Sequence, residues 1–159
     1  MGHFRILSAA TVICLIVAPA FSQEAGKSVT KTANRSTNPC DWPSESDALI
    51  AAPKNHKLLL ENDRVRVLDV TLAPGETENV HSHRWPSVLY LMSAGDFVDR
   101  DGEGHVIFDT RSLQAPMQLP FATWKEPEAA HSIENLSKTV TIHLIRVEIK
   151  RDSCKSSIP

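Results

Sequence analysis

The stretch that decides the fold is GETENVHSHRWPSVLYLMSAG, residues 75–95. It places two histidines, His81 and His83, directly before a run that is apolar and rich in strand-forming residues. Residues two apart in a strand face the same side of the sheet, so both imidazoles would point into one interior. Such a pair is typical of a metal site, yet the five residues that follow, 84–88, contain no carboxylate.

Strand-forming runs surround this stretch on both sides. Residues 56–76 predict two strands separated by a polar turn at 61–63, and residues 87–93 predict a third strand. Residues 96–109 read as a hairpin, and 139–150 as a long final strand whose alternation shifts near Leu144 and Ile145, as a bulge would cause. The Pro-rich residues 116–127 leave little room for a helix, and 48–50 allow only a short one. This pattern predicts an all-β sandwich or barrel.

A third histidine, His131, lies far along the chain at the start of the segment HSIEN. If that segment pairs antiparallel with the strand of His81 and His83, three imidazoles converge. Three neutral nitrogens suit Fe, Mn, Zn, Ni or Cu and leave positions open for water or substrate.

The spacing Gly75-x5-His81-x-His83 resembles the first motif of the cupin superfamily, and His131-x3-Asn135 resembles the end of the second. The resemblance covers residues 56–149. It implies a double-stranded β-helix, or jelly-roll barrel, with a divalent transition metal held inside by the three histidines.

The sequence departs from the cupin pattern at the acid. The glutamate of the first motif falls on Ser87 or Val88, and Ala129 or Ala130 replaces a glycine of the second. Three-histidine iron sites are known in the superfamily, among the thiol dioxygenases. The resemblance therefore implies a three-histidine metal site whose fourth ligand is open.

Six further residues are candidates for a pocket beside the metal, with Ser87 at one of the two positions where the acid would fall. Trp85 and Tyr90 would line the pocket mouth or belong to the core. Arg84 would hold an anionic substrate or lie at a solvated rim. Glu126 and Glu128 would replace the acid or act as a general base, or would be exposed loop carboxylates. No residue is assigned a catalytic role.

Two functions fit these residues. The first is a metal-dependent enzyme, a dioxygenase or isomerase of the cupin type, acting on a small organic substrate. The alternative is a non-catalytic cupin module that binds a metal or a small ligand, a reading favoured by the lack of a clear general acid or base. Cupin barrels often pair through edge strands, so the resemblance also implies a candidate homodimer.

The N-terminus has the layout of a secretory signal peptide, with a basic start, about 13 apolar residues and a small-residue exit at 18–22. The apolar run is shorter than the ~20 residues of a membrane-spanning helix. These features predict cleavage of residues 1–22, secretion or periplasmic export, and no stable membrane insertion afterwards. The mature chain would comprise a flexible lead-in (23–47), the barrel (48–150) and a tail (151–159).

Charge and cysteine content limit the remaining partners. The chain has 17 Lys and Arg against 19 Asp and Glu, and no basic stripe that would favour nucleic acid. Cys40 and Cys154 remain after cleavage. In an exported protein this pair predicts a disulfide, and the alternative is two free thiols.

Overall fold

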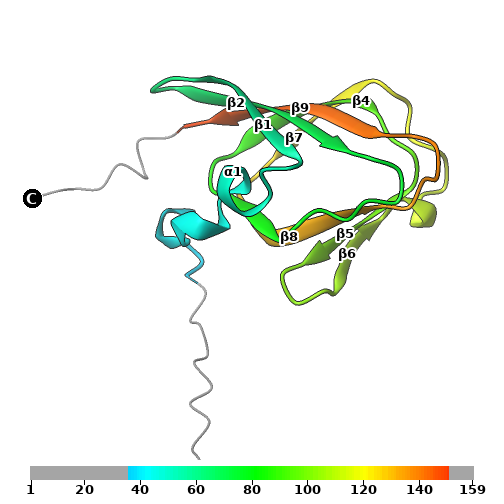
Figure 1. Ribbon diagram of the computed structural model, residues 1–159, viewed down its shortest axis with the longest axis horizontal. Coiled ribbons are helices and arrows are strands. Elements are labelled where there is room, and N and C mark those ends of the chain that lie inside the picture. Colours follow the sequence, from blue (N-terminus) through cyan, green and yellow to red (C-terminus); the bar gives the residue numbers. More distant parts are fainter. Residues whose placement is uncertain (1–35, 151–159) are drawn as a thin grey trace, which may run out of the picture. The chain divides into compact units, whose positions relative to one another are not determined.

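The computed structural model describes residues 36–150, which form two antiparallel sheets. The five-stranded sheet has the order β1-β2-β9-β4-β7, and the four-stranded sheet has the order β3-β8-β5-β6. Figure 1 shows the two sheets facing one another. The strands are β1 (His56–Glu61), β2 (Val65–Leu72), β3 (His81–His83), β4 (Ser87–Ser93), β5 (Phe97–Asp101), β6 (Val106–Asp109), β7 (Phe121–Lys125), β8 (Glu128–Asn135) and β9 (Ile142–Ile149).

The apolar core lies on the inner face of the five-stranded sheet. Alternate residues of β2 are buried, because one face of the strand points inward. Leu68, Val70 and Leu72 of β2 pack there with Leu91 of β4 and Ile142 of β9. The all-β prediction is confirmed, as is the division of residues 56–72 into two strands.

Helical structure is confined to short segments in residues 36–150. They are η1 (Pro39–Asp41), η2 (Ser44–Ser46), α1 (Ala48–Ala51) and η3 (Thr110–Ser112). The side chain of Asp47 accepts a hydrogen bond from the backbone N–H of Leu49 and so caps α1. No helix among the described residues is long and apolar enough to cross a membrane.

The final strand differs from the expectation. Strand β9 pairs with β2 in unbroken register from Leu72–Ile142 to Val65–Ile149, so the expected bulge near Leu144 and Ile145 is absent. The irregularity lies in β4, where the pairing with β9 shifts between Leu91 and Ser93. The change of pattern along β9 has a different cause: its inward side chains turn from apolar at Ile142 and Leu144 to charged at Arg146 and Glu148.

Several predictions concern residues at the ends of the chain. The signal peptide at 1–22, the tail at 151–159 and Cys154 of the expected disulfide lie outside the described residues. Part of the expected lead-in is described: Asp47 is buried and forms a two-pronged ion pair with Arg66, at 2.9 and 3.0 Å.

Candidate metal centre

Strands β3 and β8 bring the three predicted histidines together. The two strands pair antiparallel, and His81 lies directly opposite His131. The ring centroids of His81 and His131 are 4.6 Å apart, and those of His81 and His83 are 4.9 Å apart. All three side chains are buried.

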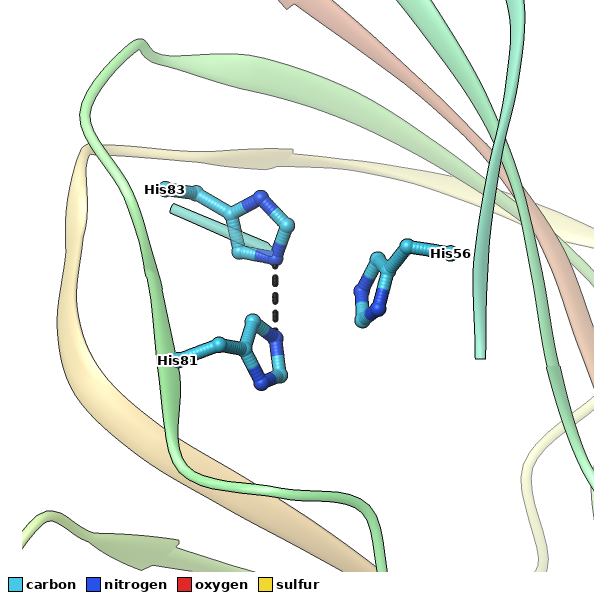
Figure 2. Close-up of side chains that lie close together, drawn as sticks. All are labelled: His56, His81 and His83. Atoms are coloured by element: carbon cyan, nitrogen blue, oxygen red, sulfur yellow. Dashed lines mark hydrogen bonds between the residues drawn. The ribbon is translucent and has the colours of Figure 1, made fainter. Parts of the chain in front are cut away.

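A fourth histidine, His56, joins this cluster from the first residue of β1. Its ring centroid lies 4.5 Å from that of His81 and 5.3 Å from that of His83 (Figure 2). The ligand atoms of His56, His81 and His83 lie within 4.8 Å of one another, so this buried group could hold a metal ion. Those of His81, His131 and Glu78 meet the same limit. His81 is common to both groups.

Each of the four rings donates its Nδ1–H to the protein, which fixes the tautomer. Three donate to backbone carbonyl oxygens, which only accept, and the fourth, His83, donates to the Glu148 carboxylate at 2.7 Å. The Nδ1 to oxygen distances are 3.2 Å from His56 to Ala52, 2.8 Å from His81 to Asn79, and 2.9 Å from His131 to Ala129. The four Nε2 atoms are therefore left as lone-pair donors, as a metal requires.

Two of these Nε2 atoms face each other. Nε2 of His81 lies 3.1 Å from Nε2 of His83, the contact drawn dashed in Figure 2. With both protons on Nδ1, neither neutral ring has a hydrogen to place between them. Two imidazole nitrogens that shared one ion at ~2.0–2.1 Å would be held at a comparably short separation, because each would lie within bonding distance of the same atom. The spacing thus fits a shared metal ion better than a hydrogen bond.

The burial of the rings keeps them neutral. Desolvation lowers the pKa of His56 to about 4 and that of His81 to about 2. It also lowers the pKa of His83 and His131, and the positive charge of Arg146 acts in the same direction on all four rings. Neutral imidazoles are the form that binds metal. The donor set of this structure therefore fits a divalent transition metal.

A buried ion-pair network holds His83 from behind. Glu148, fully buried, accepts from Nδ1 of His83 and also forms an ion pair with Arg66. The carboxylate of Glu148 is thus held from two sides, by His83 and by Arg66. Arg66 is held in turn by Asp47. Burial raises the pKa of Glu148, and Arg66 opposes this rise. A carboxylate on the far nitrogen of a ligand histidine orients the ring and makes it a better ligand.

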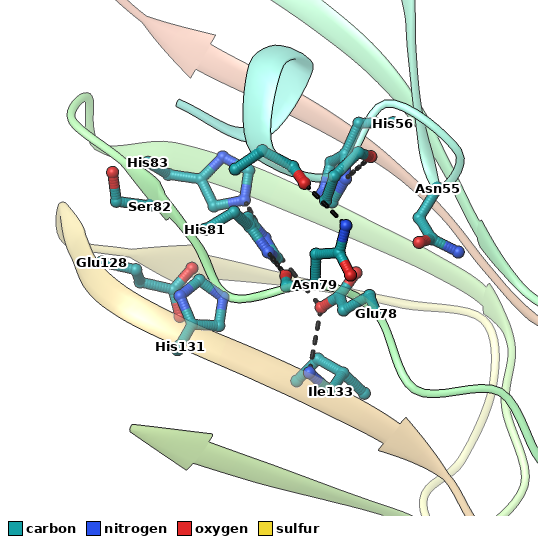
Figure 3. Close-up of polar contacts among 12 residues, drawn as sticks. Asn55, His56, Glu78, Asn79, His81, Ser82, His83, Glu128, His131 and Ile133 are labelled. Atoms are coloured by element: carbon teal, nitrogen blue, oxygen red, sulfur yellow. Dashed lines mark hydrogen bonds and ion pairs between the residues drawn. The ribbon is translucent and has the colours of Figure 1, made fainter. Parts of the chain in front are cut away.

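Two other carboxyl groups face the interior without a full set of partners. Oε1 of Glu78 accepts from the backbone N–H of Ile133 and lies 3.9 Å from Nε2 of His81 (Figure 3). Oε2 of Glu78 and Oδ1 of Asp99 are buried and have no hydrogen-bond partner among residues 36–150. Burial raises the pKa of Glu78 to about 8 and that of Asp99 to about 7. Both groups therefore hold a proton for much of the time near neutral pH.

The histidines open onto a cavity of about 300 Å³ between the two sheets. This volume is at the small end of the range for ligand sites, roughly 300–1,000 Å³. The polar lining residues other than histidines include Arg146, Lys125 and Glu128. The remaining wall is mostly apolar and includes Val70, Leu89, Leu91, Phe97, Phe108, Met117, Phe121, Ile133, Ile142 and Leu144.

Of the six pocket candidates of the sequence, Glu128 lines this cavity and the other five lie apart from the residues that line it. The hydroxyl of Ser87 is buried, and Ser87 pairs with Glu148 across to β9. The ring of Trp85 lies 4.8 Å from the Arg66 guanidinium, and Tyr90 is exposed. Arg84 donates to the carbonyl of Trp42 at 3.3 Å. Glu126 is exposed and accepts from the indole N–H of Trp124 at 2.8 Å.

Sequence reasoning missed His56, Arg146 and Glu148. His56 belongs to neither motif and carries no spacing signal, since it reaches the cluster only through the pairing of β1 with β2. Arg146 and Glu148 did leave a signal. They continue the alternation that begins at Ile142 and Leu144, so they occupy the inward face of a core strand, where unpaired charge is rare.

Comparison with known proteins relates the chain to solved structures by fold. No protein-family model matches the sequence, and no curated protein sequence matches it. A cupin domain from Bordetella pertussis Tohama I is 22% identical, with a TM-score of 0.50 over 60% of this chain and 92% of that one. A cupin superfamily protein from Desulfitobacterium hafniense DCB-2 is 14% identical, with a TM-score of 0.41 over 60% and 76% of the two chains.

An RmlC-like cupin family protein from Methanocaldococcus jannaschii, described as having a double-stranded β-helix fold, is also similar. It is 11% identical, with a TM-score of 0.45 over 62% of this chain and 81% of that one. The two facing antiparallel sheets and the likeness to the Bordetella domain agree with the fold expected from the motifs. The protein has the double-stranded β-helix fold of the cupin superfamily.

Proposed function

We propose that the protein binds one divalent transition metal through His81, His83 and His131, with His56 as a further ligand, and acts as an oxygenase on a small organic substrate. The observation that carries the metal is the pair of facing Nε2 atoms of His81 and His83, 3.1 Å apart, in a buried cluster of imidazoles. When bound, Fe, Mn, Zn, Ni or Cu would supply a Lewis acid, and a redox-active ion would also activate dioxygen.

The protein's own residues have separable roles in this proposal. Glu148 orients the ring of His83, and the backbone carbonyls orient the other three rings. Glu78 and Asp99 are the candidates for moving a proton, because their raised pKa values, about 8 and about 7, lie near neutral pH. The apolar wall excludes water from the reacting groups.

We also propose that the protein works after export, as a secreted or periplasmic enzyme. The support is the signal-like layout of residues 1–22 and the cysteine pair, Cys40 and Cys154, that an oxidising compartment would join. Intact-mass measurement after expression with the leader in an exporting host tests this proposal. Export predicts a chain that begins near Gln23.

Metal content is the first test of the proposed function. The purified protein should hold about one metal ion per chain by elemental analysis, after reconstitution with Fe, Mn, Zn, Ni or Cu where needed. We expect His83→Ala to lose the metal, because it removes one of the two facing nitrogens. His143→Ala on β9, where Nε2 of His143 lies 2.7 Å from Oδ1 of Asp69, is the matched control and should retain it. Wild-type protein that binds none of the five ions would contradict the proposal.

Oxygen consumption separates the enzyme from the binding module. The metal-loaded protein is incubated with small thiols, phenols and keto acids, and uptake is followed with an oxygen electrode. Uptake that is lost in His83→Ala and kept in His143→Ala supports the oxygenase. Stoichiometric metal with no uptake for any substrate of the panel supports the non-catalytic module instead.

A further inference from the structure

Arg146 lies where the inner face of the large sheet changes from apolar to charged. Its neighbours across the sheet are Leu68 of β2 and Leu89 of β4. The row on one side is apolar and consists of Val70, Leu144 and Leu91, whereas the row on the other side is Arg66, Glu148 and Ser87. Arg146 therefore lines a cavity whose apolar wall includes its own neighbours in the sheet.

The hydrogen-bonding capacity of Arg146 is largely unused. The residue is 3% exposed, and Nη1 donates to Oε2 of Glu128 at 2.7 Å. Nε and Nη2 are buried and have no hydrogen-bond partner among residues 36–150. Nε lies 3.8 Å from Oε1 of Glu148, which is beyond hydrogen-bond length. Burying donors without partners is costly, so a ligand that satisfies them would gain free energy.

The unpaired atoms form one edge of the guanidinium. Nε–H and one Nη2–H are parallel donors, the fork that matches the two oxygens of a carboxylate. Glu128 holds the group by Nη1 alone, which leaves that edge free. The same Glu128 also accepts from Nζ of Lys125 at 2.8 Å, so two cations in the cavity share one carboxylate. Glu148, whose Oε1 lies 3.8 Å from Nε of Arg146, is paired with Arg66, and burial raises the pKa of Glu78 and Asp99. The remaining charges of the cavity, Arg146 and Lys125 against Glu128, favour an anion beside Arg146.

We propose that the cavity binds a small monocarboxylic acid, with its carboxylate on the Nε and Nη2 edge of Arg146 and its apolar body against Leu89, Leu91 and Leu144. This inference rests on the proposed function, since it names the substrate class of the same cavity. Arg146 and the four histidines line the same cavity, so an acid held there lies beside the candidate metal site. The volume of about 300 Å³ suits an acid the size of benzoate or hexanoate.

The test uses metal-free protein, so that it does not depend on the metal. Binding of benzoate and hexanoate is measured by calorimetry and by saturation-transfer NMR, and compared with benzamide and hexanamide. The amides have nearly the same shape but no charge. We expect at least one acid to bind roughly tenfold or more tightly than its amide, because charge-assisted bidentate bonds are about twice as strong as neutral ones.

Two variants assign the effect to Arg146. Arg146→Gln removes the charge, whereas Arg146→Lys keeps the charge, can still pair with Glu128, and loses the planar fork. Both should weaken binding of the acid by roughly tenfold or more and leave the amide unchanged. Arg100→Gln, at a partly exposed position of β5 whose guanidinium is 3.4 Å from Glu134, is the matched control and should bind as the wild type does. Thermal unfolding confirms that each variant is folded.

The outcomes separate this inference from the metal proposal. The inference is overturned, whatever the metal content, if benzoate and hexanoate both fail to bind. It is also overturned if each acid binds no more tightly than its amide. A folded Arg146→Lys variant with wild-type affinity also overturns it. Selective binding of an acid by a protein that takes up no metal would support the carboxylate site and contradict the proposed oxygenase.

Discussion

Glu148 acts on the candidate metal site through His83, without belonging to either histidine group that could hold the ion. Its carboxylate receives the Nδ1 proton, which leaves Nε2 of His83 unprotonated and directed at His81. By resemblance the glutamate of the first cupin motif would fall on Ser87 or Val88, and Ser87 is the cross-strand partner of Glu148. Glu148 therefore does not take the ligand position of that glutamate; its carboxylate orients His83 from the far nitrogen of the ring.

We expect Glu148→Gln to weaken metal binding by about 10- to 100-fold, the usual effect of losing a carboxylate that orients a ligand histidine. The amide keeps the shape of the side chain but no longer strengthens the ring as a donor. Competition with a metal-sensitive dye measures the affinity. The control is Glu126→Gln, because Glu126 is an exposed carboxylate that lies shortly before His131 in the sequence. This variant should bind metal as the wild type does. Equal affinities in the two variants would contradict the role assigned to Glu148.

The sequence predicted some residues of the site and not others for physical reasons. His81, His83 and His131 follow a spacing that a strand pair converts directly into convergence. His56 has no such spacing, because its position depends on how β1 registers on β2, and register is set by the whole sheet. Its recruitment to the cluster therefore follows only from the folded structure.

At the scale of elements, the polar half of β9 misled the sequence analysis. A shift of alternation usually indicates a bulge, but here the inward face itself changes from Ile142 and Leu144 to Arg146 and Glu148. The rule that inward positions of a strand are apolar is expected to fail where function requires a buried charged residue. Strand β7, within the Pro-rich segment, was also not predicted, because its edge position needs few of the signals of a central strand.

Arg66 joins three elements and should dominate the stability of this corner. It connects Asp47, the cap of α1, with Glu148 of β9, and all three residues are buried. We expect Arg66→Met to lower the free energy of unfolding by about 3–5 kcal/mol, because it leaves buried carboxylates without their partner. Urea denaturation measures the change.

Arg100→Met provides the comparison for Arg66, since Arg100 and Glu134 form a partly exposed ion pair whose loss should cost about 0–1 kcal/mol. A loss of stability in Arg66→Met no larger than that in Arg100→Met would show that the buried network does not hold α1 and β9 together.

At the scale of the whole molecule, the buried histidines make stability depend on pH. The pKa of His56 is about 4 in the folded protein and about 6.5 when the chain is unfolded. The unfolded state therefore binds more protons between these values, and stability is lost as the pH falls from 6.5 towards 4. Glu78 and Asp99, whose pKa values are raised, act in the opposite direction over an overlapping range. A single pH profile would mix the two effects.

A difference measurement isolates His56. The free energies of unfolding of metal-free wild type and His56→Gln are compared at pH 7 and pH 4.5, so that the contributions of Glu78 and Asp99 largely cancel. We expect the wild type to lose on the order of 2–3 kcal/mol relative to the variant between these pH values, since one pKa unit corresponds to about 1.4 kcal/mol. His105→Gln, in the exposed hairpin, should follow the wild type. Parallel pH profiles for wild type and His56→Gln would mean that His56 does not titrate at a lowered pKa, which would remove one of the four neutral imidazoles from the proposed site.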